Sequence, residues 1–578
     1  MLKSFLISTF LSFLQFEINS QTNSYQLSAC QSQLYCEGPF LETVQLSGMF
    51  PKSKTFVDMT TRETNDEVTV KWQKLFKGLD DNKSPPTGAV KGFVLSNFAQ
   101  ENQGVTNWQP EDFKNDPWFI DYIQDAEMKQ FTRYLIGLYH SLGRKINDQN
   151  IEKHSSLLYV PNGYFVTSGG VNELEYWSSY WVIQGLLLCE MDKTAKGIID
   201  NFIHLIKQFG FIPGKNRLYH ASRSQPPLLT FMVWDYLLKT RDFNWLRTII
   251  KYLDLELQWW VENKLTKVNI DGLRLSMARY VSESRGPRPE MYNEDYKLVE
   301  NEDEDIQQDI FNDIKAADES GWGLSSRWMV ENLSTSNNSQ IYDINFIRAS
   351  SISPVDLNSF LYGAFLRLSS MYLILEDLEK RSYWYELARD MKKTIQLVLW
   401  DEKDGIWYDY NLDSQRPIKK YSASNLTPLW VEAYNDSLCL KAKQAFRAAS
   451  YLVRLGINKF EGGIPATLES TGEKWDFPNA FAPIQSMIVQ GLARSGSEAA
   501  AFLAEQFARD WIKANMISWK QRGVLFDYYD SERPGKTNQG VDKKFGEVNG
   551  GWSSGVLLEF INTYYVMMNK NSSFMIVT

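Results

Sequence analysis

The residues of this chain that could carry out chemistry are carboxylates, arginines and tryptophans in loops between helical segments. Residues 223–227 (RSQPP) and 286–290 (GPRPE) place arginines beside prolines, and residues 475–483 (WDFPNAFAP) place tryptophan beside an aspartate. Arginine and carboxylate side chains can hydrogen-bond to hydroxyl groups, and flat indole rings can stack on sugar faces. One interpretation is therefore carbohydrate binding. The other, which composition alone favours, is that 19 tryptophans, 29 tyrosines and 33 phenylalanines build a large aromatic core.

Metal and serine-nucleophile chemistry is not indicated. The four histidines (His140, His154, His204 and His220) have no HxxxH or HExxH spacing, so we predict structural histidines, no metal and no cofactor. Residues 551–555 (GWSSG) match GxSxG by letter. A nucleophile elbow needs a strand before it and a histidine after it, and no histidine follows His220. We therefore interpret this match as accidental.

Composition excludes several classes of protein. A chain of 578 residues with 14% aromatic and 23% charged residues is not a disordered polymer, and four cysteines are too few for a disulfide scaffold. The net charge is −9 and no basic block is present, which argues against nucleic acid as a partner. No apolar run after the N-terminus reaches about 18 residues, so we expect no stable membrane anchor.

The elements that must position these loops are helices. Apolar residues recur with helical spacing in three stripes, and period-2 alternation is rare. The stripes are Trp384, Leu387, Met391, Ile395 and Leu399; Ala499, Leu503, Phe507 and Trp511; and Phe360, Ala364 and Leu368. Helices of about 12–18 residues joined by loops predict an all-α fold of stacked helical hairpins.

The N-terminus is typical of a secretory signal peptide over residues 1–20, with one early lysine, an apolar stretch and a polar end; an uncleaved anchor is the alternative. Secretion would permit a Cys30–Cys36 disulfide, and we expect Cys189 and Cys439 to be buried free thiols. The expectation is a secreted or secretory-lumen glycoprotein. Sequons occur at Asn332, Asn337, Asn425, Asn435 and Asn571.

Several blocks resemble the trehalase family, in the family's order, over nearly the whole mature chain. They cover residues 30–58, 210–227, 286–290, 319–328, 354–358, 462–465 and 475–483. The resemblance implies an (α/α)6 toroid, with six outer and six inner helices around a central pocket, long active-site loops and an N-terminal extension. We assign the extension to residues 21–85 and the toroid to residues 86–568.

The resemblance also implies inverting glycoside hydrolysis, in which an aspartic acid protonates the bridging oxygen and a glutamate activates water roughly 6.5–9.5 Å away. The family pattern ESGWD reads Glu319-Ser-Gly-Trp-Gly323 here, so the acid position is Gly323 and carries no proton. Asp318, next to this block, is a minor alternative donor. Asp527 takes the position of the general base, one methylene shorter than the family's glutamate.

Six other positions correspond to sugar-binding residues of the family. These are Trp177, Arg223, Arg288, Glu290, Trp475 and Glu547. The chain departs from the family pattern at Val171, Ser178 and Gly214. For the retained residues the alternatives are a loop ion pair between Arg288 and Glu290 and a core position for Trp475.

Three functions follow from this pattern. The first is hydrolysis of α,α-trehalose to glucose, weakened by Gly323. The second is a non-enzymatic sugar-binding or sensing protein on the same fold. The third is a hydrolase of another glycoside, because a good leaving group reduces the need for an acid. Each takes a small sugar such as trehalose as partner.

Overall fold

The computed structural model describes residues 30, 32–75, 86–100, 104–282, 284–330, 344–537 and 550–567. The predicted signal peptide (1–20), Glu547 and the sequons at Asn332, Asn337 and Asn571 lie outside these ranges. Within them, no helix is both long and apolar enough to cross a membrane.

Six inner helices form a closed ring. In order around the ring they are α7 (Tyr176–Leu188), α9 (Leu229–Thr240), α13 (Val355–Ile374), α15 (Thr427–Val431), α17 (Ala482–Ala493) and α19 (Gly551–Ile561). Each packs against the next, and α19 closes the ring on α7. Most of their residues are buried, because neighbours cover each helix on several sides.

Six further helices form an outer layer. They are α6 (Ala126–Leu142), α8 (Asp192–Phe209), α10 (Phe243–Lys264), α14 (Leu378–Thr394), α16 (Leu438–Arg454) and α18 (Glu498–Arg522). Five of them pack on inner helices, and the other, α16, packs on α18. On the outer helices the predicted stripes face inward: Trp384, Met391, Phe507 and Trp511 are buried. Ala499, at the start of its stripe, is exposed. The predicted (α/α)6 toroid is confirmed.

The contact between α7 and α19 explains residues 551–555. A Cβ on Gly555 would lie 1.9 Å from the carbonyl oxygen of Trp181, and a Cβ on Gly185 would lie 2.8 Å from the Cα of Gly555. The two helices therefore approach so closely that only glycine fits. The GxSxG letters are the first turns of α19, and no described strand runs directly into them.

The strands are short and lie in loops. The hairpin of β6 (Leu265–Ile270) and β7 (Leu273–Ala278) turns at Asp271 and Gly272, and β13 (Asn479–Phe481) pairs with β14 (Tyr528–Asp530). The other strands are β1 (Thr60–Thr61), β2 (Phe98–Ala99), β3 (Val105–Asn107), β4 (Gly143–Ile146), β5 (Tyr164–Phe165), β8 (Ile352–Ser353), β9 (Trp400–Asp401), β10 (Ile406–Trp407), β11 (Tyr410–Asn411) and β12 (Arg416–Pro417).

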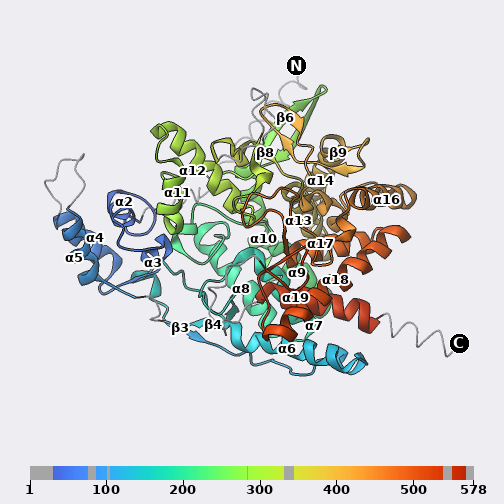
Figure 1. Cartoon of the computed structure of the whole chain (residues 1–578), viewed down its shortest axis with the longest axis horizontal. Coiled ribbons are helices and arrows are strands. Elements are labelled where there is room, and N and C mark those ends of the chain that lie inside the picture. Colours follow the sequence, from blue (N-terminus) through green and yellow to red (C-terminus); the bar gives the residue numbers. More distant parts are fainter. Residues whose placement is uncertain are drawn as a thin grey trace, which may run out of the picture.

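The segment before the toroid folds around an aromatic cluster at one edge of the molecule (blue in Figure 1). Its helices are α2 (Pro39–Leu46), α3 (Ser53–Val57), α4 (Asn65–Leu75) and α5 (Thr87–Asn97). Phe40 of α2 contacts Trp72 of α4 at 4.4 Å and Phe93 of α5 at 5.7 Å between ring centroids. These ring contacts hold the four helices to one another.

The cysteines divide into one disulfide and two free thiols. Cys30 and Cys36 are bonded, with a Cα–Cα distance of 5.8 Å, as predicted. Cys189 is buried, also as predicted. The prediction for Cys439 is wrong: it is exposed, because it lies in the first turn of α16 on the face turned away from the core. The sequon at Asn425 is only 1% exposed, so the folded protein cannot carry a glycan there.

Candidate active site

Five of the predicted site residues, Trp177, Arg223, Arg288, Glu290 and Trp475, lie at one end of the ring, which we call the mouth. Trp177 begins α7 and Trp552 begins α19, while Trp475 lies in the loop before α17. Arg223 precedes α9, and the loop after β7 carries Arg288 and Glu290. Residues from distant parts of the sequence are thus placed at the same end of the ring.

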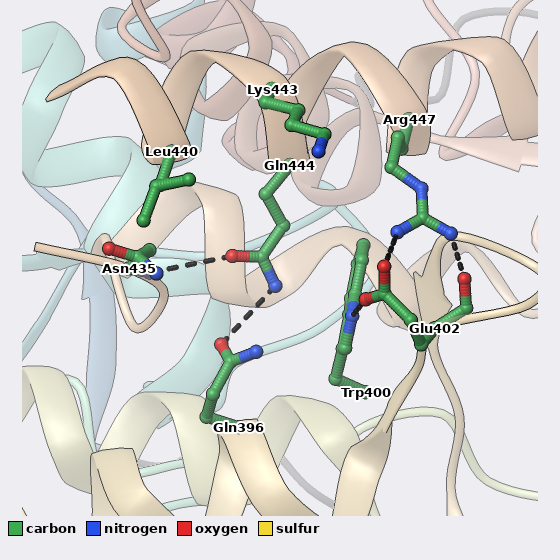
Figure 2. Close-up of a pocket in the computed structure, with 8 residues that line it drawn as sticks. All are labelled: Gln396, Trp400, Glu402, Asn435, Leu440, Lys443, Gln444 and Arg447. Carbon is green, nitrogen blue, oxygen red and sulfur yellow. Dashed lines mark hydrogen bonds and ion pairs between the residues drawn. The ribbon is translucent and has the colours of Figure 1, made fainter. Parts of the chain in front are cut away.

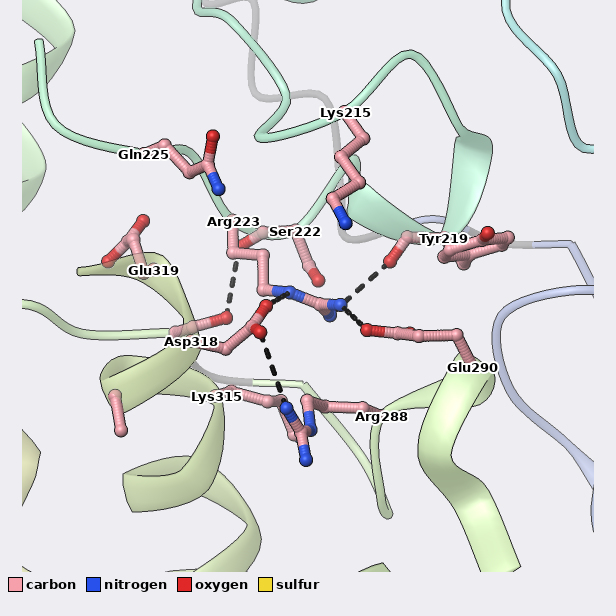
Figure 3. A network of polar contacts seen from close by, with 12 residues as sticks. Lys215, Tyr219, Ser222, Arg223, Gln225, Arg288, Glu290, Lys315, Asp318 and Glu319 are labelled. Carbon is pink, nitrogen blue, oxygen red and sulfur yellow. Dashed lines mark hydrogen bonds and ion pairs between the residues drawn. The ribbon is translucent and has the colours of Figure 1, made fainter. Parts of the chain in front are cut away.

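A buried network of charges links the arginines of this mouth (Figure 3). Arg223 donates from Nε to Asp318 Oδ2 at 2.7 Å and from Nη2 to Glu290 Oε1. Arg288 approaches the other oxygen of Asp318 at 3.3 Å, so Asp318 lies between both guanidinium groups. The remaining face of Arg288 binds both oxygens of Asp295, at 2.8 and 2.7 Å. The predicted alternative, an ion pair between Arg288 and Glu290, is replaced by this wider network.

Burial and the neighbouring arginines shift the pKa values of the two acids in this network in opposite directions. Burial raises the pKa of Asp318, but the guanidinium groups of Arg223 and Arg288 outweigh burial and hold this pKa below its usual range. An ionised, doubly paired carboxylate is a poor proton donor, which argues against Asp318 as a replacement acid. Burial raises the pKa of Glu290 in spite of the opposing charge of Arg223. The second oxygen of Glu290 is buried and has no partner among the described residues.

Glu319 has a structural task behind the network. It forms a buried ion pair with Lys264 at 2.7 Å, and it accepts hydrogen bonds from the backbone N–H groups of Ser224 (3.0 Å) and Val281 (3.2 Å). Ser224 directly follows Arg223 in the chain. Glu319 therefore positions the loop that carries Arg223.

The N-terminal helices hold the same loops from outside. Gln45 of α2 donates to the carbonyl oxygen of Pro289 at 3.0 Å, between Arg288 and Glu290. Ser53, the first residue of α3, donates to Glu294 at 2.5 Å in α11 (Tyr292–Val299), the helix that follows them. The segment before the toroid thus braces the mouth.

The acid position is an open turn. Gly323 has φ +65°, its N–H donates to the carbonyl of Ala317 at 3.1 Å, and its carbonyl accepts from Trp328 Nε1 at 2.9 Å. A Cβ built on Gly323 meets no atom within 4 Å, whereas a Cβ on Gly321 would lie 2.5 Å from the ring of Trp177. Space for a side chain therefore exists at position 323 but not at position 321.

The tryptophans of the mouth pack on one another. Trp475 stacks on Phe481 at 3.7 Å and on Trp322 at 5.2 Å, and it contacts Trp177 at 5.6 Å between ring centroids. Trp177 is 2% exposed and Trp475 5% exposed. Both belong to a buried aromatic wall and present little ring face to solvent. The Nε1 atoms of Trp177 and Trp552 are buried without a partner among the described residues.

A single carboxylate fixes the loop before α17. Asp476 accepts from Ser325 Oγ at 2.8 Å, from Ser326 N at 2.8 Å and from Thr467 Oγ1 at 3.0 Å. These bonds attach the loop of Trp475 to the segment that follows Gly323. Asp527, at the base position, is half-buried and directly precedes β14, which pairs with β13 in front of α17.

The substituted positions change the charge of the mouth. A Cβ on Gly214 would lie only 3.1 Å from the side chain of Gln225 and 3.1 Å from the carbonyl oxygen of Ser224, so the space beside Gly214 is already filled. The next residue, Lys215, points toward Arg223 (Figure 3). Lys215 is 3.6 Å from Glu175. The hydroxyl group of Ser178 donates a hydrogen bond to the carbonyl oxygen of Glu175 at 3.5 Å. Lys215 thus adds a positive charge beside Arg223 and Arg288.

A hollow of about 140 Å³ between the end of α14 and α16 is separate from this mouth (Figure 2). Its polar side chains are bonded to one another: Arg447 pairs with Glu402, and Gln444 donates to Gln396 at 3.2 Å. Trp400 Nε1 also donates to Glu402, at 2.7 Å. Its position on the outer helices gives it no part in the site described above.

Sequence reasoning missed the residues that hold the site, namely Asp295, Asp476 and the role of Glu319. Asp476 and Glu319 lie inside sequence blocks that resemble the trehalase family, and this position could have indicated that they matter for the site. Asp295 lies in α11 outside those blocks, and only the fold brings it to Arg288.

Comparison with known proteins gives a consistent picture. The family model described as trehalase matches residues 48–565. A trehalase of Tenebrio molitor is 38% identical over 549 residues, which are 94% of this chain and 97% of that protein. The human trehalase is 35% identical over 538 residues, 93% of this chain and 90% of that protein. The solved structure of neutral trehalase Nth1 from Saccharomyces cerevisiae has a TM-score of 0.54 at 20% identity, covering 70% of this chain and 75% of that one.

Proposed function

The chain belongs to the trehalase family, and from this membership we propose that it hydrolyses α,α-trehalose to glucose with inversion, at a rate reduced by the loss of the general acid. The observation that carries the proposal is the assembly of Arg223, Arg288 and Glu290 at one mouth of the toroid. Arg223 comes from one loop and Arg288 and Glu290 from another, and their shared network is braced from behind by Glu319 and Gln45. The chain maintains this arrangement although position 323 carries no acid.

In the proposed reaction the base activates water on one face of the sugar, and the leaving glucose departs without a proton from position 323. Asp527 supplies the carboxylate for the first task. Loss of a general acid typically lowers the rate by about 10²–10⁴-fold and does not abolish it. Because Asp318 is paired with Arg223 and Arg288, it is a poor proton donor. Slow turnover is the expected result.

Purified protein incubated with trehalose provides the test. Proton NMR of the first products should show α- and β-glucose in equal amounts, because inversion at one anomeric carbon releases β-glucose and the other glucose leaves as α. Asp527→Asn should remove this slow activity without loss of folding. Only α-glucose at early times would contradict inversion.

The second candidate is sugar binding without turnover. The ionised state of Asp318 and the open turn at Gly323 favour it, since together they leave no proton donor at the acid position. Calorimetric binding of trehalose by a protein that releases no glucose, even after long incubation, would replace the hydrolase with this function.

For the compartment, we infer secretion or residence in a secretory lumen. The Cys30–Cys36 disulfide supports this, because disulfides persist in oxidising compartments. Mass spectrometry of the expressed protein should find cleavage near Ser20 and a mass increase after reduction and alkylation that matches this bond. Free thiols at Cys30 and Cys36 in the untreated protein would contradict the inference.

A further inference from the structure

A cavity of about 310 Å³ opens at the other end of the toroid. Its polar lining comes from the second halves of five inner helices: Gln184 of α7, Asp235 of α9, Arg367 of α13, Gln490 of α17 and Glu559 of α19. The residues of the active-site mouth lie in or before the first turns of the inner helices. The two sites therefore lie at opposite ends of the same ring, and we call this one the distal cavity.

The charged groups of the distal cavity are not paired with one another. Asp235 accepts from Gln184 Nε2 at 2.5 Å and from Tyr180 OH at 3.1 Å, and Glu559 accepts from Gln490 Nε2 at 2.7 Å. Arg367 donates to the carbonyl of Gly363 at 3.1 Å. Within the described ranges, no ion pair joins either acid to an arginine, although Arg494 also lines the cavity. This differs from the active-site mouth, where acids and arginines are paired.

Arg367 is the clearest sign that something else completes the site. Its guanidinium lies over the ring of Phe231 at 4.0 Å, and its Nε is buried with no hydrogen-bond partner among the described residues. A buried guanidinium N–H without a partner costs free energy. The carboxylates of Asp235 and Glu559 likewise have one oxygen each that no described residue binds.

The acidic and basic side chains that line the distal cavity indicate which class of ligand it binds. The lining combines two carboxyl groups with two arginines, and burial raises the pKa of Glu559 to about 7, so this acid is partly protonated near neutral pH. A hydroxyl group suits such a lining, because it can donate to a carboxylate and accept from a protonated carboxyl or a guanidinium. Trp430 and Tyr180 also line the cavity, but at 3% and 5% exposed they contribute ring edges rather than open ring faces. The volume is at the lower end of the range for small-molecule pockets. We propose that the distal cavity binds a neutral polyhydroxylated molecule of about monosaccharide size.

Hydrogen–deuterium exchange on the full chain localises binding without any mutation. D-glucose at millimolar concentration should slow exchange in the second halves of α17 and α19. Arg288→Ala, in the active-site mouth, should leave this protection in place, because the mouth lies at the other end of the toroid. Absence of protection at the distal cavity with saturating glucose would overturn the proposal, whether or not the mouth is protected. Protection by glycine, a zwitterion, but not by glucose would overturn the assigned ligand class.

Two variants test the residues. Arg367→Gln and Glu559→Gln should each raise the Kd for the distal site about tenfold or more, since each removes a charged partner of a hydroxyl group. Arg447→Gln, a matched change in the outer hollow of Figure 2, should leave the Kd unchanged. Unchanged affinity in both cavity variants, with the circular dichroism spectrum retained, would refute the site. The result is independent of trehalose turnover.

Discussion

Restoring an aspartate at position 323 is the most direct test of how this site works. Gly323→Asp places a carboxyl in a turn whose Cβ position is open to 4 Å and whose backbone is held by Ala317 and Trp328. The Cβ of the new side chain therefore meets no neighbouring atom within 4 Å. Its only structural cost is the left-handed backbone at φ +65°.

The gain and the cost can be compared. A general acid contributes about 10²–10⁴-fold to the rate, which corresponds to about 2.7–5.4 kcal/mol of transition-state stabilisation. A left-handed backbone costs an L-residue about 1–2 kcal/mol, and aspartate tolerates it better than most residues. The expected result is faster trehalose hydrolysis with a small loss of stability.

Initial rates of glucose release, measured beside thermal unfolding, provide the assay. Gly323→Asn is the matched control, because asparagine tolerates the same backbone but carries no acidic proton. Gly321→Asp is a steric control that should unfold the mouth, since its Cβ would lie 2.5 Å from Trp177. Adding Asp527→Glu to Gly323→Asp should increase the rate further, because it restores the reach of the base.

The reasoning fails if Gly323→Asp folds, binds trehalose and hydrolyses it no faster than Gly323→Asn. Such a result would show that the differences from the family pattern at Val171, Ser178 and Gly214 already prevent catalysis at this site. Sugar binding would then replace hydrolysis as the function.

Three further predictions concern binding, pH dependence and packing. Arg288→Ala should weaken trehalose binding by about 1–3 kcal/mol in calorimetry, and unchanged affinity would mean that Arg288 only anchors the loop. Glu256 is a buried residue of α10, and burial raises its pKa from an ordinary value of 4.5 to about 8. Glu256 therefore stabilises the fold most at a pH below 4.5, and this stabilisation is lost as the pH rises from 4.5 to about 8. Glu256→Gln should flatten the decline of the urea midpoint across this window, and an unchanged slope would exclude Glu256 as its source. Gly555→Ala should lower the free energy of unfolding by about 1–3 kcal/mol or more, because its Cβ would lie 1.9 Å from the carbonyl oxygen of Trp181. Urea denaturation measures this loss. A wild-type urea midpoint would show that α7 and α19 can separate without cost.

The helices and the missing side chain at the acid position could be predicted from the sequence, and the family resemblance implied how the helices assemble into a toroid. Helical spacing at Trp384, Met391, Phe507 and Trp511 predicts which faces are buried, because a helix repeats every 3.6 residues whatever it packs against. The identity of Gly323 is equally local: a residue without a side chain holds no proton in any fold. Cys30 and Cys36 are so close in the chain that their bond needed little tertiary information.

Only the tertiary structure decided which partners each group meets. Asp318 lies between Arg223 and Arg288 because the ends of α12 (Glu304–Glu319) and two separate loops converge, and this contact changes it from a candidate acid into a fixed anion. Periodicity could not show that Cys439 faces solvent, since the direction of a helix face depends on its neighbours. The distal cavity follows the same rule: its acids and arginines are isolated in sequence, and the closed ring alone brings them around one space.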